Sequence, residues 1–329
     1  MSIKKLIHNK QFIIGIIILI CATSAAIGYY KYVSYYPSTD DAYIKAYIVN
    51  IAPKINGPVD STNVTNNEYV KKGTLLFTIV KKPYQLAVNK AKTDLLLAKQ
   101  NVKLSKSEAQ VAQVSVNEAN ANYLYSEQTY KRDTYLNKKH IISDQIEDNV
   151  RRNFNVSKEK FISALSVLKQ EKLKIDVANS TVKAANTELN IAKLNLSYTK
   201  IYAPADGYVS NFHLAAGEYI NTGEQLFAFI ESDQWWIKAN FKETDLKRIK
   251  PGQDVNVYID MYGKNIPGKV QSIAYGSGST YSLLPPENAT GNWVKVTQRF
   301  PVRILVKNNN PNSPLRVGST VNVTVNTVS

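Results

Sequence analysis

"NGPVDSTNVTNNEYVKKGTLLFTIV", residues 56–80, returns later in the chain as "DGYVSNFHLAAGEYINTGEQLFAFI", residues 206–230. The two stretches align without a gap at a constant offset of 150 residues. The identical pairs include Gly57 with Gly207, Val59 with Val209, Tyr69 with Tyr219, Gly73 with Gly223, Leu76 with Leu226 and Phe77 with Phe227. Agreement at this many positions indicates one structural unit that occurs twice.

Each copy has short alternating apolar runs broken at glycine, a pattern typical of β-strands joined by tight turns. We assign Gly57, Gly73, Gly207 and Gly223 to these turns. One copy has only about 30 residues, which is too few to bury a core of its own. The two copies are therefore predicted to face each other in one β-domain, and the segment between them must leave that domain and return.

The intervening segment, residues 81–200, has the period of a coiled coil. Small and apolar residues recur in steps of four and three, first on the outgoing arm and then on the returning arm. The outgoing seam is Tyr84, Val88, Ala91, Leu95, Ala98, Val102, Ser105, Ala109, Ala112, Val116, Ala119, Tyr123, Ser126 and Tyr130. The returning seam is Phe154, Ser157, Phe161, Ala164, Leu168, Glu171, Ile175, Ala178, Val182, Ala185, Leu189, Ala192 and Leu196. We expect an antiparallel helical hairpin with arms of roughly 70 Å, at 1.5 Å per residue.

The rest of the chain after Gln234 is predicted to be all β. Short alternating runs punctuated by Pro-Gly and Gly-Lys indicate an antiparallel β-barrel over residues 233–329, with "DDAYIKAYIVNI" near residue 45 as an added strand.

A run of 20 residues without a formal charge, 11–30, lies near the N-terminus. About 20 apolar residues span a bilayer, and three preceding lysines favour a cytoplasmic N-terminus. We assign the run to a membrane anchor that includes Phe12, Ile16, Leu19 and Ile27. A cleaved signal peptide is the alternative, with "CATSAA" as its cleavage region. Ile20 before Cys21 argues against a lipoprotein.

The predicted fold class is therefore α+β, with a transmembrane helix, a split β-domain, a long coiled-coil hairpin and a C-terminal β-barrel. The two halves of the split β-domain resemble those of a lipoyl domain, and we call them lipoyl-like. The expected division is a cytoplasmic N-terminus at 1–10, the anchor at 11–31, a linker and first barrel strand at 32–50, the first lipoyl-like half at 51–80, the hairpin at 81–200 with its tip at 132–146, the second half at 201–232 and the barrel at 233–329.

Composition and motifs argue against several other classes of protein. The net charge is +15, but the lysines are spread along the whole chain, which favours solvated faces over a nucleic-acid site. With one cysteine and three scattered histidines, neither a disulfide nor a metal site is expected. "GKNIPGK", residues 263–269, lacks the Ser or Thr that a phosphate-binding loop requires at the next position. No catalytic arrangement stands out, so we expect neither an enzyme nor a bound cofactor.

Together these features resemble the periplasmic adaptors, or membrane fusion proteins, of the HlyD-like family. The nearest resemblance is to the EmrA-type multidrug efflux branch. The stretches that carry it are "STDDAYIKAYIVNIAPKINGPV" at 38–59, "YTKIYAPADGYVS" at 198–210, "WWIKANFKETDLKRIKPGQ" at 235–253 and "YSLLPPENATGNWVKVTQRFPVRI" at 281–304.

The resemblance implies an adaptor in the bacterial inner membrane, with one membrane pass and most of the chain in the periplasm. It implies an EmrB-like major-facilitator transporter as inner-membrane partner, a TolC-like outer-membrane channel, and self-assembly into trimers or hexamers around a conduit. An adaptor for an ATP-driven (ABC-type) exporter of peptides or proteins is the alternative. A swinging-arm cofactor carrier is disfavoured, because the coiled coil replaces the turn that would carry the modified lysine.

Many members of the family carry a tip motif of Arg, three residues, Leu, six residues and Ser. Arg132, Leu136 and Ser143 fit this spacing in "RDTYLNKKHIIS", residues 132–143, and the resemblance implies that they contact the outer-membrane channel. Other readings remain open for two of them: Arg132 as a solvated helix residue, and Ser143 as the N-cap of the returning helix. Leu136 lies off the seam, so no partner within the hairpin is expected for its side chain.

Overall fold

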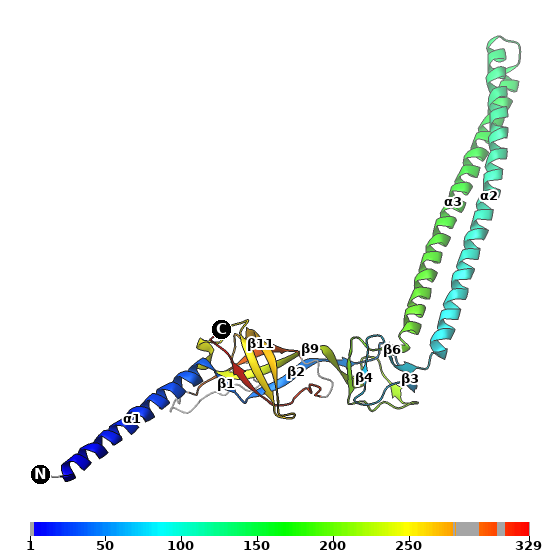
Figure 1. The fold of residues 1–329 in the computed structure, drawn as a ribbon. Coiled ribbons are helices and arrows are strands. Elements are labelled where there is room, and N and C mark those ends of the chain that lie inside the picture. Colours follow the sequence, from blue (N-terminus) through cyan, green and yellow to red (C-terminus); the bar gives the residue numbers. More distant parts are fainter. Residues whose placement is uncertain (1–2, 279, 281–295, 308–312, 329) are drawn as a thin grey trace, which may run out of the picture.

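The computed structural model describes residues 3–278, 280, 296–307 and 313–328, except for the side chains of 3–14 and 32–33. The chain is strongly elongated (Figure 1). Helix α1 (Ile3–Tyr35) extends from one end, two β bodies lie in the middle, and helices α2 (Lys82–Lys138) and α3 (Asp144–Ser197) project from the other end as a hairpin.

The first β body is built from the two sequence repeats, and each repeat pairs with the other. Its short strands are β3 (Gly57–Thr62), β4 (Tyr69–Val70), β5 (Leu75–Ile79), β6 (Lys200–Tyr202), β7 (Gly207–Ser210) and β8 (Tyr219–Ile220). Gly57 pairs with Ile220 between β3 and β8, and Val70 pairs with Gly207 between β4 and β7. Because Gly57 and Gly207, and likewise Val70 and Ile220, are 150 residues apart, the same pairing is made twice.

The hydrogen bonds around these strands repeat in the same way. The amide of Val59 donates to the Glu218 carbonyl at 2.8 Å, and that of Val209 donates to the Glu68 carbonyl at 3.0 Å. The two copies share one core, so neither half is a folding unit by itself. Its fully buried large side chains are Val59, Leu76, Phe77, Ile79, Val209, Ile220 and Phe229.

The second β body is an antiparallel barrel. Its strands are β1 (Ser38–Thr39), β2 (Ala42–Ile51), β9 (Phe227–Lys242), β10 (Asp254–Ile259), β11 (Lys264–Ile273), β12 (Arg299–Val306) and β13 (Val321–Val325), with a short 3-10 helix, η1 (Asp245–Lys247). The pairing order is β2, β9, β12, β11, β10 and β13, and a bridge from Tyr43 to Thr320 joins the two ends. Inward-facing aliphatic side chains of alternating strand positions fill the barrel.

Two long strands connect the barrel to the repeat body. β2 and β9 pair from Ala42 opposite Ala239 to Ile51 opposite Phe227, with a register shift between Ala46 and Ile48. The strand predicted from "DDAYIKAYIVNI" is thus β2. β9 runs without a break through residues 232 and 233, where the sequence suggested a domain boundary, so the two bodies share a continuous ribbon.

The hairpin confirms the predicted seam. Every seam position from Tyr84 to Tyr130 and from Phe154 to Leu196 is buried or half-buried in the structure. Near the far end the seam becomes aromatic: Tyr123 stacks on Phe161 with ring centroids 5.6 Å apart, and Tyr130 stacks on Phe154 at 5.2 Å. Alanine, valine and leucine side chains pack the near end of the seam, and aromatic pairs pack the distal end.

The end of α1 is held against the barrel. The carbonyl of Tyr35 accepts a hydrogen bond from the Thr327 hydroxyl at 2.8 Å, and the Arg248 guanidinium lies 4.1 Å from the centre of the Tyr35 ring. A cation at the C-terminus of a helix also complements the helix dipole.

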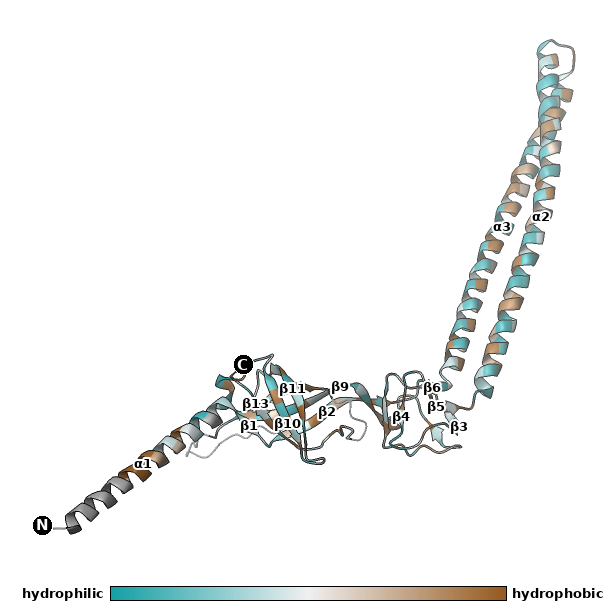
Figure 2. Cartoon of the chain, viewed as in Figure 1, coloured by the Kyte–Doolittle hydropathy of each residue, from teal (hydrophilic) through white to brown (hydrophobic). Residues whose placement is uncertain are grey.

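The predicted anchor, residues 11–31, lies within α1, and the side chains of Ile16, Leu19 and Ile27 on this helix are exposed. Phe12 belongs to the part of α1 whose side chains lie outside the described residues. Figure 2 shows the most hydrophobic colours of α1 next to its grey segment and paler, more polar colours toward the β bodies. Among the residues that the structure describes, no helix has the length and hydropathy needed to cross a bilayer.

Candidate functional site

The hairpin tip begins with the end of α2, which the chain terminates without glycine. The amides of His140 and Ile141 donate to the carbonyls of Asn137 and Leu136, at 2.7 and 3.1 Å. These two bonds form a Schellman motif, and His140 takes the left-handed backbone conformation that the motif requires, with φ of 59°. A non-glycine residue in this conformation is uncommon. The turn therefore lacks the glycine or proline that usually identifies a turn in a sequence.

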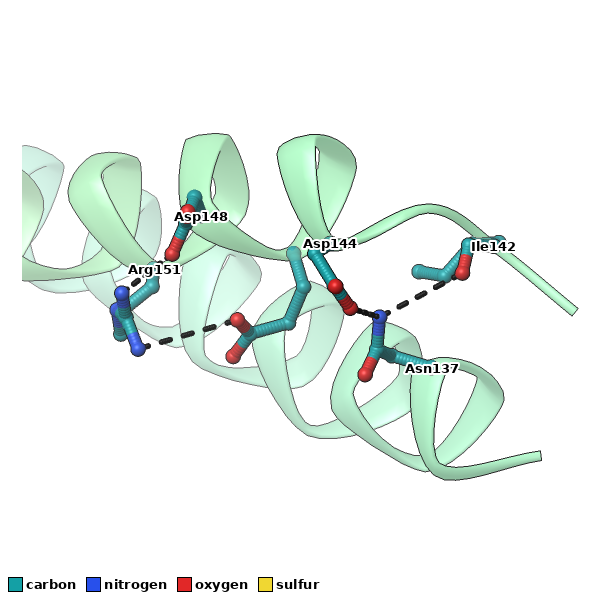
Figure 3. Close-up of polar contacts among 6 residues, drawn as sticks. Asn137, Ile142, Asp144, Asp148 and Arg151 are labelled. Carbon is teal, nitrogen blue, oxygen red and sulfur yellow. Dashed lines mark hydrogen bonds and ion pairs between the residues drawn. The ribbon is translucent and has the colours of Figure 1, made fainter. Parts of the chain in front are cut away.

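The Asn137 side chain joins the two helices across this turn (Figure 3). Its amide nitrogen donates to the Asp144 carboxylate at 3.0 Å and to the Ile142 carbonyl at 3.5 Å. Because Asp144 is the first residue of α3, one side chain links the last turn of α2 to the first turn of α3. Sequence reasoning did not identify Asn137, although an amide within a break between two helices is a usable signal.

The first turns of α3 carry their own ion pairs. Arg151 pairs with Glu147 and Asp148, one helical turn away (Figure 3). Acidic residues in a first turn also favour the helix N-terminus. These polar contacts stabilise the first turns of α3. They do not involve the apolar side chains of the tip.

The three residues of the predicted tip motif occupy different environments. Arg132 is exposed and pairs with Asp133 at 3.0 Å. Leu136 lies one turn further along α2 and is half-buried. Ser143 is exposed and occupies the N-cap position of α3, but its side chain makes no capping hydrogen bond. The backbone carbonyl of Leu136 accepts a hydrogen bond that ends α2, and its side chain is half-buried. The absence of a side-chain partner within the hairpin stays a prediction.

Other apolar side chains at the tip are more exposed than Leu136. Tyr135, Ile141 and Ile146 have exposed fractions of 61%, 67% and 47%. These exposed apolar side chains are available for contact with a protein partner. The sequence signal for this exposed apolar surface is the pair of isoleucines at 141 and 142, which the tip motif does not include.

Of the four predicted turn glycines, Gly73 and Gly223 lie in turns, whereas Gly57 and Gly207 are the first residues of β3 and β7. Gly57, Gly73 and Gly223 have positive φ values of 144°, 80° and 82°. Gly207 is required for a different reason: a Cβ there would lie 2.2 Å from the Ile230 carbonyl oxygen and 2.8 Å from the Phe229 ring.

The root of the hairpin contains a second polar anchor. The Tyr84 hydroxyl donates to the Asn56 carbonyl at 2.6 Å and so joins α2 to the repeat body. Burial raises the pKa of this phenol above its ordinary value of 10.0, and the nearby Tyr219 adds to the shift. In the part of the chain that the structure describes, no group of three or more His, Cys, Asp or Glu residues could hold a metal ion.

Comparison with known proteins places this architecture among characterised relatives. Residues 47–232 match the barrel-sandwich hybrid domain of RND-type membrane fusion proteins, and residues 234–326 match the AAEA-like β-barrel domain. The chain is 33% identical to the probable multidrug resistance protein EmrK of Escherichia coli, covering 97% of this chain and 85% of that protein. It is 31% identical to the multidrug export protein EmrA of Haemophilus influenzae, covering 92% and 80%.

A solved structure shows the same fold. MacA from Actinobacillus actinomycetemcomitans superposes with a TM-score of 0.60 at 21% identity, covering 88% of this chain and 79% of that one. The residues of the "YSLLPPENATGNWVKVTQRFPVRI" stretch up to 295 lie outside the described residues, so that part of the resemblance rests on sequence.

Proposed function

Because the chain belongs to the membrane fusion protein family, we propose that it is the periplasmic adaptor subunit of a tripartite multidrug efflux pump. The single observation that carries the proposal is the hairpin, which places an exposed apolar tip at the far end of two helices of 57 and 54 residues. At 1.5 Å per residue, these helices extend about 80 Å from the β bodies. A protein that only bound a small molecule near the membrane has no use for such a projection.

The tip is proposed to contact a TolC-like outer-membrane channel. Arg132, Leu136 and Ser143 match the motif of the family, and the exposed Tyr135 and Ile141 supply apolar area beside them. Interfaces are dominated by a few aromatic, apolar and Arg anchors surrounded by polar residues, and the tip has this composition.

The opposite end is proposed to face the inner membrane. The charge-free run of residues 11–30 lies within α1, and its described apolar side chains are exposed. Insertion of α1 as a single-pass anchor, with the N-terminus in the cytoplasm, would cover them. The barrel then lies close to an EmrB-like major-facilitator transporter, and the β bodies and hairpin are periplasmic.

In the proposed role, the protein forms part of the transport conduit and catalyses no reaction. Several copies, as a trimer or hexamer, surround the path between transporter and channel, and the transporter selects the solute. The continuous β2–β9 ribbon and the aromatic distal seam suit this role, because they connect the tip to the barrel through paired strands and packed helices.

The test is a deletion strain examined against dyes, uncouplers, detergents and antibiotics, with and without the full-length gene. We expect sensitivity to several compounds on deletion and recovery on complementation. Affinity purification of the full chain in mild detergent should recover a many-span transporter without a nucleotide site. Recovery of an ATPase would instead assign the chain to an ATP-driven exporter, and unchanged sensitivity to every compound would overturn the proposal.

A further inference from the structure

The hairpin has two broad lateral faces with different chemistry. In a heptad with seam positions a and d, positions e and b follow a around the helix, and g and c follow d. In an antiparallel pair, the e and b positions of both helices lie on one side of the seam, and the g and c positions lie on the other. We name these sides the lysine face (e and b) and the neutral face (g and c), for residues 88–132 and 154–196.

Two observations support this assignment of the g and c positions of both helices to one face. A groove of about 520 Å³ on the hairpin is lined by both helices, with Ser115, Glu118, Asn122 and Tyr125 of α2 opposite Asn153 and Lys160 of α3, which are all g or c positions. Glu108 of α2 also interacts electrostatically with Lys174 of α3, and both occupy g. The g and c positions of the two helices therefore share one face.

The charge on the two faces is very unequal. The lysine face has ten lysines and two carboxylates, Glu127 and Asp176, which gives a net charge of +8. Its lysines are Lys92, Lys99, Lys103, Lys106, Lys131, Lys158, Lys169, Lys172, Lys183 and Lys193, and all of them are exposed. The neutral face has four basic residues and four acidic residues, so its net charge is zero.

The lysines are not neutralised within the described chain. Among the described residues, only Lys131 of this set makes an ion pair, with Glu127 at 2.9 Å. Lys99 and Lys103 are spaced i,i+4, and Lys103 and Lys106 are spaced i,i+3, so they repel each other along the helix surface. An anionic partner along this face would remove a repulsion that the hairpin alone leaves in place.

The length of the face indicates the shape of that partner. From Lys92 to Lys131 the lysines extend over about 60 Å at 1.5 Å per residue. A small anion contacts one or two such groups, whereas an extended polymer with repeated negative charges can contact many. A long row of cations contributed by both helices is therefore suited to a polyanion.

We propose that the lysine face binds peptidoglycan, a polymer of the periplasm that carries repeated carboxylates. This inference rests on the proposed periplasmic role of the chain. The contact would restrain sideways movement of the hairpin through many weak ion pairs between lysines and carboxylates. Solvent ions compete with each of these pairs. The tip would remain free to bind its own partner.

The test uses the purified full-length chain in detergent and insoluble peptidoglycan sacculi, with co-sedimentation as the measurement. The wild-type chain should sediment at low salt and be released as the salt concentration rises, because exposed charge contacts are screened. The variant Lys99→Gln/Lys106→Gln should bind about fivefold more weakly, a fold-change that corresponds to the loss of two exposed charge contacts.

The matched control is Lys90→Gln/Lys160→Gln, which removes the same charge from the neutral face and should bind within about twofold of wild type. Glutamine retains helix propensity, and circular dichroism would verify equal folding of both variants. Failure of the wild-type chain to sediment, equal loss in both variants, or equal competition by anionic phospholipid vesicles would each overturn the proposal. Complementation of drug sensitivity is measured separately, so failure of this inference is distinguishable from failure of the proposed function.

Discussion

The amide of Ile141 donates a hydrogen bond to the carbonyl of Leu136 at 3.1 Å, and this contact ends the outgoing helix of the hairpin. The bond spans a residue, His140, whose backbone is in the left-handed region. The reversal at the tip is thus a helix-capping event made by backbone groups, and the apolar side chain of Ile141 is left exposed beyond it.

Replacement of His140 by glycine should stabilise the tip. Glycine adopts the left-handed conformation without the Cβ strain of histidine, so we expect a gain of about 0.5–1 kcal/mol in local stability. Slower hydrogen exchange at the Ile141 amide would measure it. His213→Gly, at an exposed position with negative φ, is the control and should give no gain; equal protection in both variants would contradict the strain argument.

Substitution of exposed tip residues should impair channel contact without unfolding the hairpin. Ile141→Asp and Arg132→Asp place a negative charge on an exposed surface, so we expect normal expression and normal co-purification of the transporter. Crosslinking to the channel should be lost, together with drug resistance. Leu136→Asp should do the same with some loss of tip stability, because Leu136 is half-buried. Full drug resistance in the Arg132→Asp/Ile141→Asp double variant would show that the tip does not contact the channel.

Truncation of an aromatic seam residue should loosen the distal half of the hairpin only. Phe154 contacts Tyr123 and Tyr130, with ring centroids 5.8 and 5.2 Å apart. Phe154→Ala should cost about 2–3 kcal/mol, less than a fully buried phenylalanine. Hydrogen exchange should accelerate around residues 123–161 while amides near Val88 keep their protection. Uniform acceleration along both helices would show instead that the hairpin unfolds as one unit.

Addition of a single methyl group at Gly207 should destabilise the repeat body strongly. The new Cβ would approach the Ile230 carbonyl and the Phe229 ring, both in the shared core region, so Gly207→Ala should cost about 2–3 kcal/mol. Thermal unfolding measures the effect. Gly278→Ala, where a Cβ meets no atom within 4 Å, is the control and should leave the midpoint nearly unchanged.

Removal of the Tyr84 hydroxyl should weaken the root of the hairpin and change its response to alkali. Tyr84→Phe loses the hydrogen bond to Asn56, at a cost of about 1 kcal/mol at neutral pH. Because the folded-state pKa of Tyr84 is raised above its ordinary value of 10.0, this contribution is complete below pH 10.0 and is lost as the pH rises through the folded-state pKa. The stability difference between wild type and Tyr84→Phe should therefore shrink above pH 10; a constant difference would contradict the assignment.

Some features of the candidate site were accessible from sequence and others were not. The spacing of Arg132, Leu136 and Ser143 located the tip, because the heptad seams stop on either side of it. The role of Asn137 and the exposure of Ile141 were missed, since both depend on how the ends of two helices meet in space. Ser143 matches a capping signal in sequence, yet its side chain makes no capping bond and Asn137 reaches Asp144 instead.

The sequence by itself determined the parts of the protein that periodicity encodes. The coiled-coil seam could be read residue by residue, because a side chain buried in a helical pair must recur at a period of 3.5. The repeat at an offset of 150 likewise required two β units that share one core, because one unit alone cannot bury its apolar residues.

Only the tertiary structure decided how those two units combine. Gly57 pairs with Ile220 of the other copy, and Val70 pairs with Gly207, so each half is completed by strands about 150 residues away. Backbone hydrogen bonds make these pairings, and every non-proline residue carries the same donor and acceptor, so side-chain pattern cannot identify the partner. The same reason applies to the left-handed turn at His140 and to the ribbon of β2 and β9, where long-range backbone geometry joins what the sequence presents as separate segments.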